Sequence, residues 1–171
     1  RAHSCVTNAQ GWTYCSGDNG FSQLAKEDPL PETVSVRVSR LPQDTTLTRI
    51  ASGANHTCGS DADTVFCWGR NNRGQLATDL DTLSTAVPVQ APLQASADRL
   101  MGDGDITCAL LDDGRLFCVG DNTHRVISDA DRDEITGFTR VHSSVTFRQV
   151  SVAASHACGV TQDQEVICWG D

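Results

Sequence analysis

The chain carries a pair of cysteines that recurs four times at a nearly constant interval. Successive first cysteines are 53, 50 and 50 residues apart, and the second cysteine follows the first by 10, 9, 10 and 10 residues. The pairs are Cys5 and Cys15, Cys58 and Cys67, Cys108 and Cys118, and Cys158 and Cys168, which together are all the cysteines of the chain. A period near 50 residues is typical of repeat architectures, in which each unit packs on its neighbours. We therefore expect one repeat domain with units at approximately 1–46, 47–96, 97–146 and 147–171, the last of them incomplete.

The residues around each cysteine pair have the pattern of a β-hairpin. Short β-branched or aromatic runs contain the second cysteine at 64–68, 115–119 and 165–169. In the third unit Asp113-Gly114 separates the two cysteine-bearing runs. Asp-Gly between apolar runs indicates a hairpin turn, because glycine accepts positive φ without strain. The two cysteines of a unit then lie on paired strands near the open end of the hairpin, where cross-strand neighbours are within disulfide reach.

Further strands are predicted between the hairpins. They are expected at 34–38, 86–90 and 139–142, followed by 47–50 and 146–151. Pro88 limits its segment to an edge strand or a bulge, because proline donates no hydrogen bond to a sheet. A glycine two positions after the second cysteine recurs in every unit and suits a crowded centre or the bend that leaves the hairpin. Four strands per repeated unit predict an all-β fold, either a β-propeller of four-stranded blades or a comparable solenoid.

The composition excludes several classes of function. The chain has 171 residues, of which 39% are hydrophobic and 20% are charged, values that suit a folded globular protein. Its net charge of −9 argues against nucleic-acid binding and against docking on an anionic membrane surface, since both need a basic footprint. No apolar run approaches the length of a membrane span, so we expect no membrane insertion.

The second unit resembles a known repeat. Residues 50–59 and 65–76 contain a His-Thr element, a Trp-Gly-x-Asn element and a Gly-Gln-Leu element. This combination closely resembles the repeat of the regulator of chromosome condensation family, and the fourth unit is a second good match. Units one and three depart from the pattern, because Ser16 and Val119 replace Trp and Ile106 replaces His. The paired cysteines are similar to those of secreted and cell-surface members, such as plant receptor ectodomains and bacterial exported proteins.

The resemblance implies a particular architecture. Members of that family form seven-bladed propellers, so four hairpins with three intervening strand pairs would be a partial ring of about four blades. Either the chain is part of a longer polypeptide, or its open blade edges pair with another chain, because exposed edges invite partner strands. The remainder of its own propeller, or another copy, is thus an expected partner.

The cysteines could be disulfides, metal ligands or catalytic thiols. Zinc sites prefer two to four residues between paired cysteines, whereas these pairs are nine or ten residues apart. Catalytic thiols rarely recur in four equivalent copies. The spacing therefore favours four disulfides, one within each unit, which would place the protein in an oxidising compartment.

Three histidines occupy the same repeat position, two residues before a cysteine. They are His3, His56 and His156, and could converge on a metal at a propeller axis. Ile106 holds this position in the third unit, so an apolar residue serves there equally well. We therefore expect these histidines to bond the backbone of a neighbouring blade, since buried polar groups find partners. His124 and His142 are expected at the surface.

Two further motifs are candidate ligand or modification sites. The segment 128–134 is rich in carboxylates, but lacks the glycine and glutamate of an EF-hand loop. Two interpretations remain: a solvated acidic loop, or a different kind of calcium site at Asp129, Asp131 and Asp133. Asn55-His56-Thr57 is an N-glycosylation sequon, placed where the resemblance implies a strand that enters the blade core.

These observations favour an extracytoplasmic binding module: extracellular, at the cell surface or periplasmic. Its partner would be a protein or a glycan bound by loops on a rigid scaffold. The expected contacts are acidic loop residues, namely Glu27, Asp28, Asp79, Asp81, Asp129, Asp131 and Asp133. We find no catalytic arrangement and expect no enzyme and no metal or cofactor. The alternatives are a structural subunit that assembles through its blade edges and a propeller enzyme with an unrecognised site.

Overall fold

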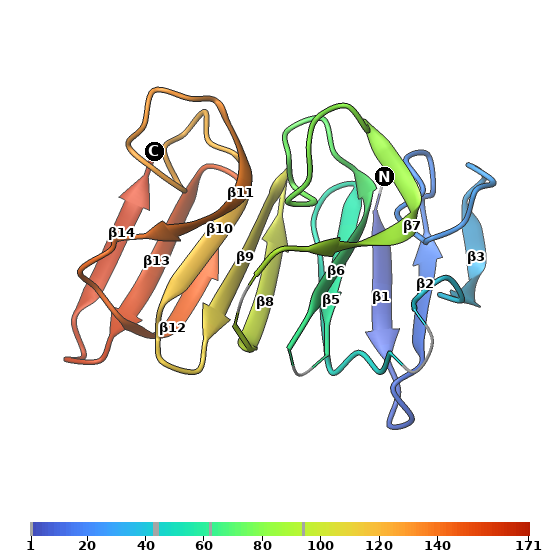
Figure 1. The fold of residues 1–171 in the computed structure, drawn as a ribbon, viewed down its shortest axis with the longest axis horizontal. Coiled ribbons are helices and arrows are strands. Elements are labelled where there is room, and N and C mark those ends of the chain that lie inside the picture. Colours follow the sequence, from blue (N-terminus) through green and yellow to red (C-terminus); the bar gives the residue numbers. More distant parts are fainter. Residues whose placement is uncertain (1, 43–44, 62, 94) are drawn as a thin grey trace.

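The computed structural model describes residues 2–42, 45–61, 63–93 and 95–171, and this part of the chain is all-β (Figure 1). The strands form four antiparallel sheets, which we call blades 1 to 4. Blade 1 contains β1 (His3–Thr7), β2 (Thr13–Gly17) and β3 (Glu32–Arg37); blade 2 contains β4 (Arg49–Ser52), β5 (His56–Ser60), β6 (Val65–Arg70) and β7 (Ser84–Ala91); blade 3 contains β8 (Ala97–Asp103), β9 (Ile106–Leu111), β10 (Leu116–Asp121) and β11 (Glu134–Val141); and blade 4 contains β12 (Phe147–Val152), β13 (His156–Thr161) and β14 (Val166–Gly170). Among the described residues no helix is long and apolar enough to span a bilayer.

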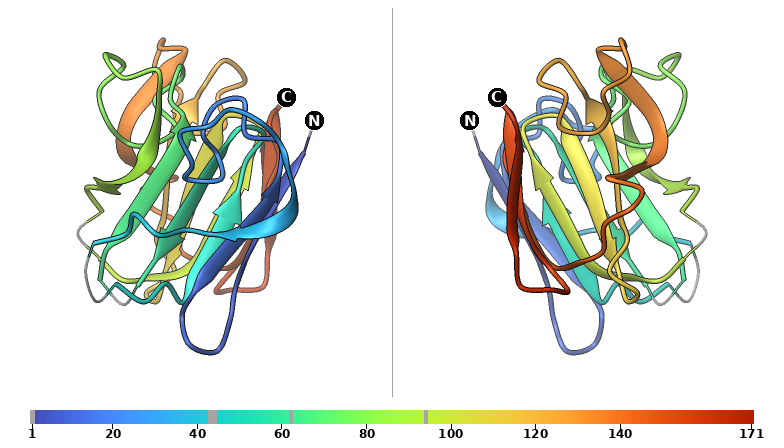
Figure 2. Two further views of the ribbon diagram at one scale, coloured as in Figure 1. Left: turned by 90° about the vertical axis from the view of Figure 1, so that its right-hand side faces the viewer. Right: turned by 90° about the vertical axis from the view of Figure 1, so that its left-hand side faces the viewer.

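The blades stand side by side in chain order as consecutive sectors of a β-propeller (Figure 1). The first strands β4 and β8 contact each other, and β12 contacts β8, so these strands lie on the inner side of the arc. The last strands β3, β7 and β11 lie at the opposite edge of their sheets. Every blade is a meander, and equivalent connections therefore emerge at the same end of each sheet (Figure 2).

The cysteine-bearing hairpins form as the sequence predicts. Cys108 of β9 lies directly opposite Cys118 of β10, and the other three pairs have the same register. Pro88 lies in β7, which among the described residues pairs only with β6, and the ladder is irregular opposite this segment. Both expectations for Pro88, a sheet edge and a bulge, are therefore met at once.

The glycines after the second cysteines create the bend that leaves each hairpin. Gly69 has φ of 100°, a conformation that disfavours any side chain, and a Cβ added there would lie 2.6 Å from the carbonyl oxygen of Asn55. The next amide, that of Arg70, donates to the same carbonyl at 2.9 Å. The close approach needed for this bond therefore requires glycine, and Gly17, Gly120 and Gly170 have the same geometry.

The hydrophobic core is divided among the junctions between neighbouring blades. Trp68, Leu24 and Leu47 are fully buried between blades 1 and 2, and separate clusters fill the junctions between blades 2 and 3 and between blades 3 and 4. We name these junctions 1/2, 2/3 and 3/4. Cohesion of such a fold is a sum of nearest-neighbour interfaces, so each junction can be altered separately.

Candidate functional site

Three long connections emerge together at one end of the blades. They join β2 to β3, β6 to β7 and β10 to β11, and we call them loop 1 (residues 18–31), loop 2 (71–83) and loop 3 (122–133). The end that they form is the loop face, and the short hairpin turns lie at the other end (Figures 1 and 2). The seven predicted contact residues Glu27, Asp28, Asp79, Asp81, Asp129, Asp131 and Asp133 all lie in these loops and are exposed. The fold therefore gathers them on one face of the molecule.

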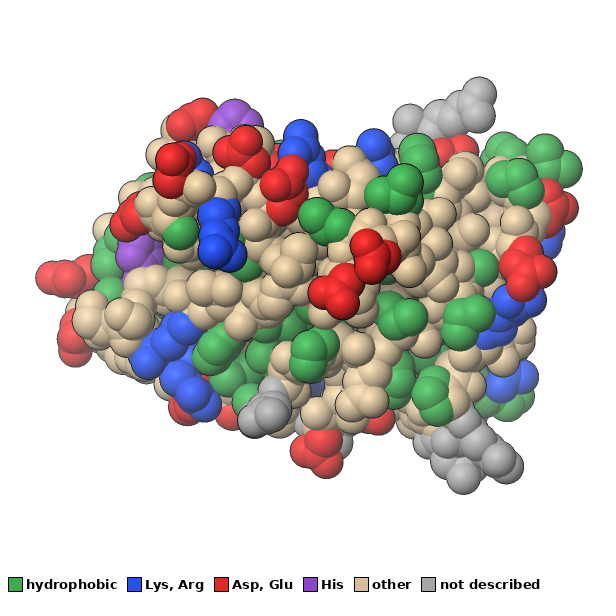
Figure 3. All heavy atoms as spheres, turned by 45° about the horizontal axis from the view of Figure 1, so that its top comes forward, with side chains coloured by type: hydrophobic (Ala, Val, Ile, Leu, Met, Phe, Trp, Pro, Cys, Tyr) green, Lys and Arg blue, Asp and Glu red, His purple; other side chains and the backbone are tan. Residues whose placement is uncertain are grey.

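The charge is not evenly spread over this face. Figure 3 shows acidic side chains across it, crowded toward the part that blade 3 forms, with hydrophobic side chains lying among them toward the other part. The difference follows from the sequences of the three loops.

One buried asparagine organises each loop. Asn19, Asn71 and Asn122 have no exposed surface, and each comes shortly after the glycine of its blade. The Asn122 side-chain amide donates to the carbonyls of Ser128 and Arg132, both at 2.9 Å, while its oxygen accepts from the amide of Ile127 at 3.0 Å. Asn19 makes equivalent bonds in loop 1. The resemblance marked these asparagines as part of a motif, and the structure shows that they hold the loops in one conformation.

Ion pairs neutralise part of loops 1 and 3. Glu27 accepts from Arg40 at 2.6 Å, and this hydrogen bond lowers the pKa of the Glu27 carboxyl. In loop 3 Arg125 donates to Asp131 at 2.9 Å and to the carbonyls of Ala130 and Arg132. Arg73 pairs with Glu134 at 2.5 Å, and the pKa of Arg73 is raised chiefly by that bond.

The suggested calcium site is not assembled. In the described residues there is no group of three or more His, Cys, Asp and Glu side chains able to hold a metal. Asp131 is directed to Arg125 instead of toward Asp129 or Asp133. The arginine stands in a position that glycine occupies in loop 2, a substitution that the carboxylate count of the segment does not reveal.

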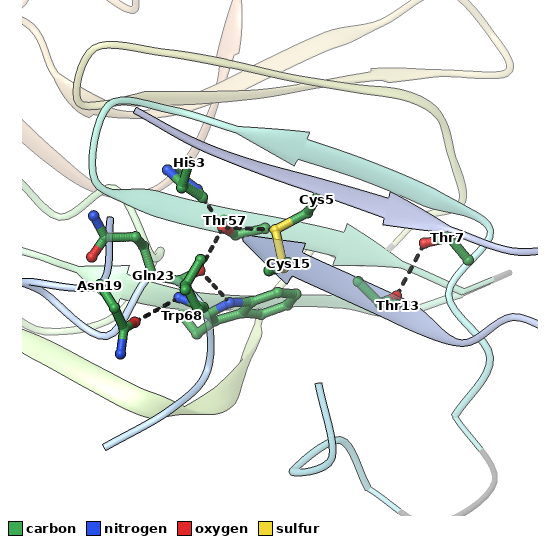
Figure 4. Close-up of a disulfide and its surroundings, with 10 residues drawn as sticks. His3, Cys5, Thr7, Thr13, Cys15, Asn19, Gln23, Thr57 and Trp68 are labelled. Carbon is green, nitrogen blue, oxygen red and sulfur yellow. Dashed lines mark hydrogen bonds between the residues drawn. A yellow bond between two sulfur atoms is a disulfide. The ribbon is translucent and has the colours of Figure 1, made fainter. Parts of the chain in front are cut away.

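The recurring histidines belong to the blade junctions. His3 Nε2 donates to Thr57 Oγ1 at 2.8 Å (Figure 4). His56 Nε2 donates to Thr107 Oγ1 at the same distance. The expected partner, a backbone group of the next blade, is therefore wrong in detail, because the direct partner is a threonine hydroxyl. The threonine hydroxyl in turn donates to a backbone carbonyl: Thr57 Oγ1 donates to the carbonyl of Gln23 at 2.9 Å.

Burial determines the protonation of these histidines. His56 is 1% exposed, and desolvation, followed by the repulsion of His3, lowers the pKa of His56 to about 3. The pKa of His3 is lowered as well, for the same primary reason. Both are neutral at physiological pH with the proton on Nε2, because the threonine hydroxyl has already donated its own hydrogen. His156 is exposed, so the three histidines form no common metal site in the described structure.

The other two histidines have local partners. His124 pairs with Asp171 of blade 4. The ring of His142 meets Trp169 edge-on at 4.7 Å between centroids.

Each blade contains one disulfide. The bonds join Cys5 to Cys15, Cys58 to Cys67, Cys108 to Cys118 and Cys158 to Cys168, with Cα atoms 4.1 Å apart in every pair. No cysteine is free. In blades 1, 2 and 3 the disulfide links the two strands of the hairpin, and the second of these strands continues directly into the loop. The disulfides therefore stabilise the strands on which the loop face is built.

The glycosylation sequon spans two environments. Asn55 lies in the turn between β4 and β5 on the loop face and is partly exposed. Thr57 is completely buried in junction 1/2. Modification of Asn55 stays a prediction.

The sequence comparison identifies the repeat. The family model described as "Regulator of chromosome condensation (RCC1) repeat" matches residues 47–75 and 101–125. Blade 2, around the first matched segment, has the His-Thr, Trp-Gly-x-Asn and Gly-Gln-Leu elements, whereas blade 3 has Ile106 and Val119 in place of the histidine and the tryptophan. The chain belongs to the RCC1-like repeat β-propellers.

Known proteins resemble this RCC1-like chain to different extents. It is 31% identical over 129 residues to the human probable E3 ubiquitin-protein ligase HERC6, which covers 70% of the chain and 12% of that protein. It is 27% identical over 121 residues to the human regulator of chromosome condensation, covering 70% of the chain and 28% of that protein. The RCC1-like chain thus spans well under two thirds of these relatives.

Solved structures show the same fold. Human WBSCR16 superposes with a TM-score of 0.87 at 21% identity, covering 99% of this chain and 45% of that one. Yeast RCC1, solved bound to Kap60, gives 0.85 at 19% identity, with 99% and 42% covered. The ectodomain of the receptor kinase ACR4 from Arabidopsis thaliana gives 0.65 at 21% identity, with 99% and 52% covered.

Proposed function

We propose that this RCC1-like chain is an extracytoplasmic protein-binding module that receives its partner on the loop face. The observation that carries the proposal is the combination of one disulfide per blade with loops that are fixed by buried asparagines on a single face. Rigid scaffolds that present loops are a common basis of recognition. A loop that is ordered before binding loses less conformational entropy when a partner arrives.

The disulfides support the extracytoplasmic part of the proposal. Reducing compartments keep thiols reduced, whereas oxidising ones form and preserve disulfides. Each bond closes a loop of 9 or 10 residues, worth roughly 2.5–3 kcal/mol in the chain-entropy model. Blades that lack parts of the repeat motif, such as blade 3, would depend on this contribution.

Mass spectrometry of the native protein tests the compartment. Protein recovered from its natural source under non-reducing conditions is expected to be lighter than the reduced chain by eight hydrogen atoms. After proteolysis, each disulfide is expected to join two cysteines of the same blade. Recovery of the native protein with free thiols would contradict the extracytoplasmic assignment.

The relatives support a protein partner. Yeast RCC1 was solved bound to Kap60, and the Arabidopsis ACR4 domain is the ectodomain of a receptor kinase. The ligase activity named for HERC6 belongs to a protein of which this chain spans 12%. The acidic loops fit a basic or polar protein surface better than an acidic one.

Charge neutralisation on opposite faces tests the binding surface. The loop-face variant changes Asp79, Asp81, Asp129 and Asp133 to Asn. The matched control changes the exposed residues Asp63, Asp112, Asp163 and Glu165 of the hairpin turns to Asn or Gln. Cross-linking to proteins of the exported fraction is expected to be reduced in the first variant and retained in the second. Equal cross-linking by both variants and the wild type would show that the loop face is not the binding surface.

A further inference from the structure

Loops 1 and 2 expose leucines, whereas loop 3 does not. Leu30 is 63% exposed, Leu80 39% and Leu83 65%, and none of the large hydrophobic side chains of loop 3 is exposed. A single exposed leucine is common on a soluble protein. Three of them on two neighbouring loops of one face instead resemble the apolar anchors of an interface.

The leucines of loop 2 are held in place by its backbone. Asn71 donates from its side chain to the carbonyls of Asp79 at 2.9 Å and Thr82 at 3.1 Å. Its main-chain amide donates to the carbonyl of Leu83 at 2.7 Å. Both sides of Leu80 and Asp81 are thereby tethered to a fully buried residue, and the leucines point outward from an ordered segment.

Free carboxylates surround the leucines. Asp79 and Asp81 are exposed, and within the described residues neither has an ion-pair partner. In loop 1 Asp28 is 3.7 Å from Lys26, a distance that gives only weak pairing at the surface. Loop 3 differs, because Arg125 donates hydrogen bonds to the Asp131 carboxylate and to the carbonyl of Ala130. Two exposed carboxylates without an ion-pair partner among the described residues therefore lie beside the leucines, whereas the corresponding carboxylates of loop 3, Asp129 and Asp133, have no exposed leucine near them in their loop.

A shallow hollow opens next to these residues, between blades 2 and 3. It has a volume of about 510 Å³ and is lined by Ala77, Thr78, Asp79, Gln90, Pro92 and Thr136. Asp79, which directly precedes Leu80 in the sequence, is one of the residues that line this hollow. A long cationic side chain with an apolar stem fits such a hollow.

We propose that the partner is a basic, partly apolar protein segment, which binds through Leu30, Leu80 and Leu83 with the carboxylates of loops 1 and 2 around them. We call these leucines and carboxylates the leucine surface. The inference rests on the proposed function and narrows it from three loops to two. Lysine or arginine side chains of the segment meet Asp79, Asp81 and Asp28, and its apolar side chains cover the leucines. The net charge of −9 favours the approach of such a segment.

Selection from a random peptide library tests the partner class. A phage-displayed library of random 12-residue peptides is panned on the wild-type chain, and enriched peptides are synthesised for affinity measurement. They are expected to combine Lys or Arg with aliphatic or aromatic residues. Their affinity for the double variant Leu80→Ser, Leu83→Ser should fall by about tenfold or more, as for removal of interface anchors. Asp79→Asn, Asp81→Asn should also weaken binding, and added salt should reduce the effect of that charge change.

Matched variants elsewhere separate the possible outcomes. Asp129→Asn, Asp133→Asn removes the same charge from loop 3, and Val6→Ser, Val166→Ser removes apolar side chains that are 61% and 70% exposed away from the loop face. Both controls should bind as the wild type does, and all variants should melt within a few degrees of it. Binders that respond to loop 3 instead of loop 2 would overturn the leucine surface while leaving the loop face intact. Binders that respond only to the change at Val6 and Val166 would overturn both the leucine surface and the proposed function. Binders that lack cationic residues would overturn the proposed class of partner.

Discussion

Junction 1/2 and junction 3/4 occupy equivalent places in the fold but are closed by different chemistry. At junction 1/2 His3 donates to Thr57, which donates to the carbonyl of Gln23. At junction 3/4 the places of His3 and Thr57 are taken by Ile106 and Ala157, which are 0% and 1% exposed. Both members of the hydrogen-bonded pair are therefore replaced, and by apolar residues.

The histidine and the threonine of a junction are thus present together or replaced together. A buried imidazole or hydroxyl without a partner costs roughly 1–3 kcal/mol, so changing one member alone is unfavourable. Junction 2/3 retains the pair as His56 and Thr107, although Val119 stands there in place of the tryptophan. The element common to junctions 1/2 and 2/3 is the backbone carbonyl four residues after the buried asparagine, which accepts the threonine hydroxyl at each.

Placing one polar member in the apolar junction should have the largest effect. Ile106→His is expected to destabilise the chain by about 3 kcal/mol, because it removes buried apolar surface and leaves an imidazole facing Ala157 without a partner. Adding Ala157→Thr should recover about 1–2 kcal/mol by completing the pair, with Val126 supplying the carbonyl. Urea unfolding of the two single variants and the double variant measures the coupling.

The coupling energy decides whether the pair is a unit. Ala157→Thr alone is expected to destabilise junction 3/4 as well, since its hydroxyl would face Ile106. Strictly additive effects of the two changes would show that the His-Thr pair has no cooperative role.

Converting the polar junction 2/3 into an apolar one should remove acid sensitivity. The pKa of His56 is about 3 in the folded chain and near 6.5 when unfolded. Between these values the unfolded chain binds a proton that the folded chain does not, so stability falls as the pH falls, by up to about 1.4 kcal/mol per pH unit. The double variant His56→Ile, Thr107→Ala should lose this part of the slope between pH 6.5 and 3.

The variant isolates one histidine from the other titrating groups. The carboxylates are common to both proteins, so the difference between their stability curves reports the titration of His56 together with its repulsion of His3. Equal slopes from denaturant unfolding at a series of pH values would mean that His56 is not held neutral by burial.

The sequence predicts the hairpins well and the inner strands less well. Cysteine spacing and β-branched runs locate β5, β6, β9 and β10, because local pairing determines them. The strand β8 was not predicted: a register irregularity between Ala97 and Arg99 interrupts its alternation, and Gly102 near its end has no side chain to contribute. Its position is determined by packing against β4, a contact with residues about 50 positions away.

The junction chemistry was partly visible in the sequence. The recurrence of histidine indicated a contact between blades, but the partner lies one unit further along, as in His3 with Thr57. The signal was the joint loss of His and Thr in successive units, at Ile106 and Ala157. Likewise, acidic residues in the loops were predicted as contacts, whereas the leucines were missed because only burial shows that they are exposed.

Removing the tryptophan donor should have a smaller effect that differs between the junctions. Trp68 is fully buried and its Nε1 donates to the carbonyl of Gln23 at 2.9 Å, whereas Trp169 is partly exposed and donates to the carbonyl of Val126 at 2.8 Å. Trp68→Phe is expected to cost about 2 kcal/mol through the lost bond and the cavity, and Trp169→Phe about 1 kcal/mol. Thermal unfolding of both variants checks the order, and equal losses would show that the difference in exposure does not matter.

The smallest expected effect concerns the residue before each acceptor carbonyl. Ser22, Gly74 and Arg125 occupy this position with φ of 64°, 78° and 56°, in the left-handed region. Ser22→Gly relieves a conformation that costs about 1 kcal/mol for a residue with a Cβ, partly offset by the greater freedom of glycine when unfolded. A gain of about 0.5 kcal/mol is therefore expected.

Arg125→Gly relieves the same conformation but should lower stability by roughly 1 kcal/mol, because Arg125 donates to Asp131 and to two loop carbonyls. The two substitutions are chemically parallel, so opposite signs in calorimetry would show that loop 3 depends on its arginine while loop 1 tolerates a strained serine. A gain in both would mean that the arginine contacts contribute less than the backbone strain, and that the acidic side chains of loop 3 are as free to meet a partner as those of loop 2.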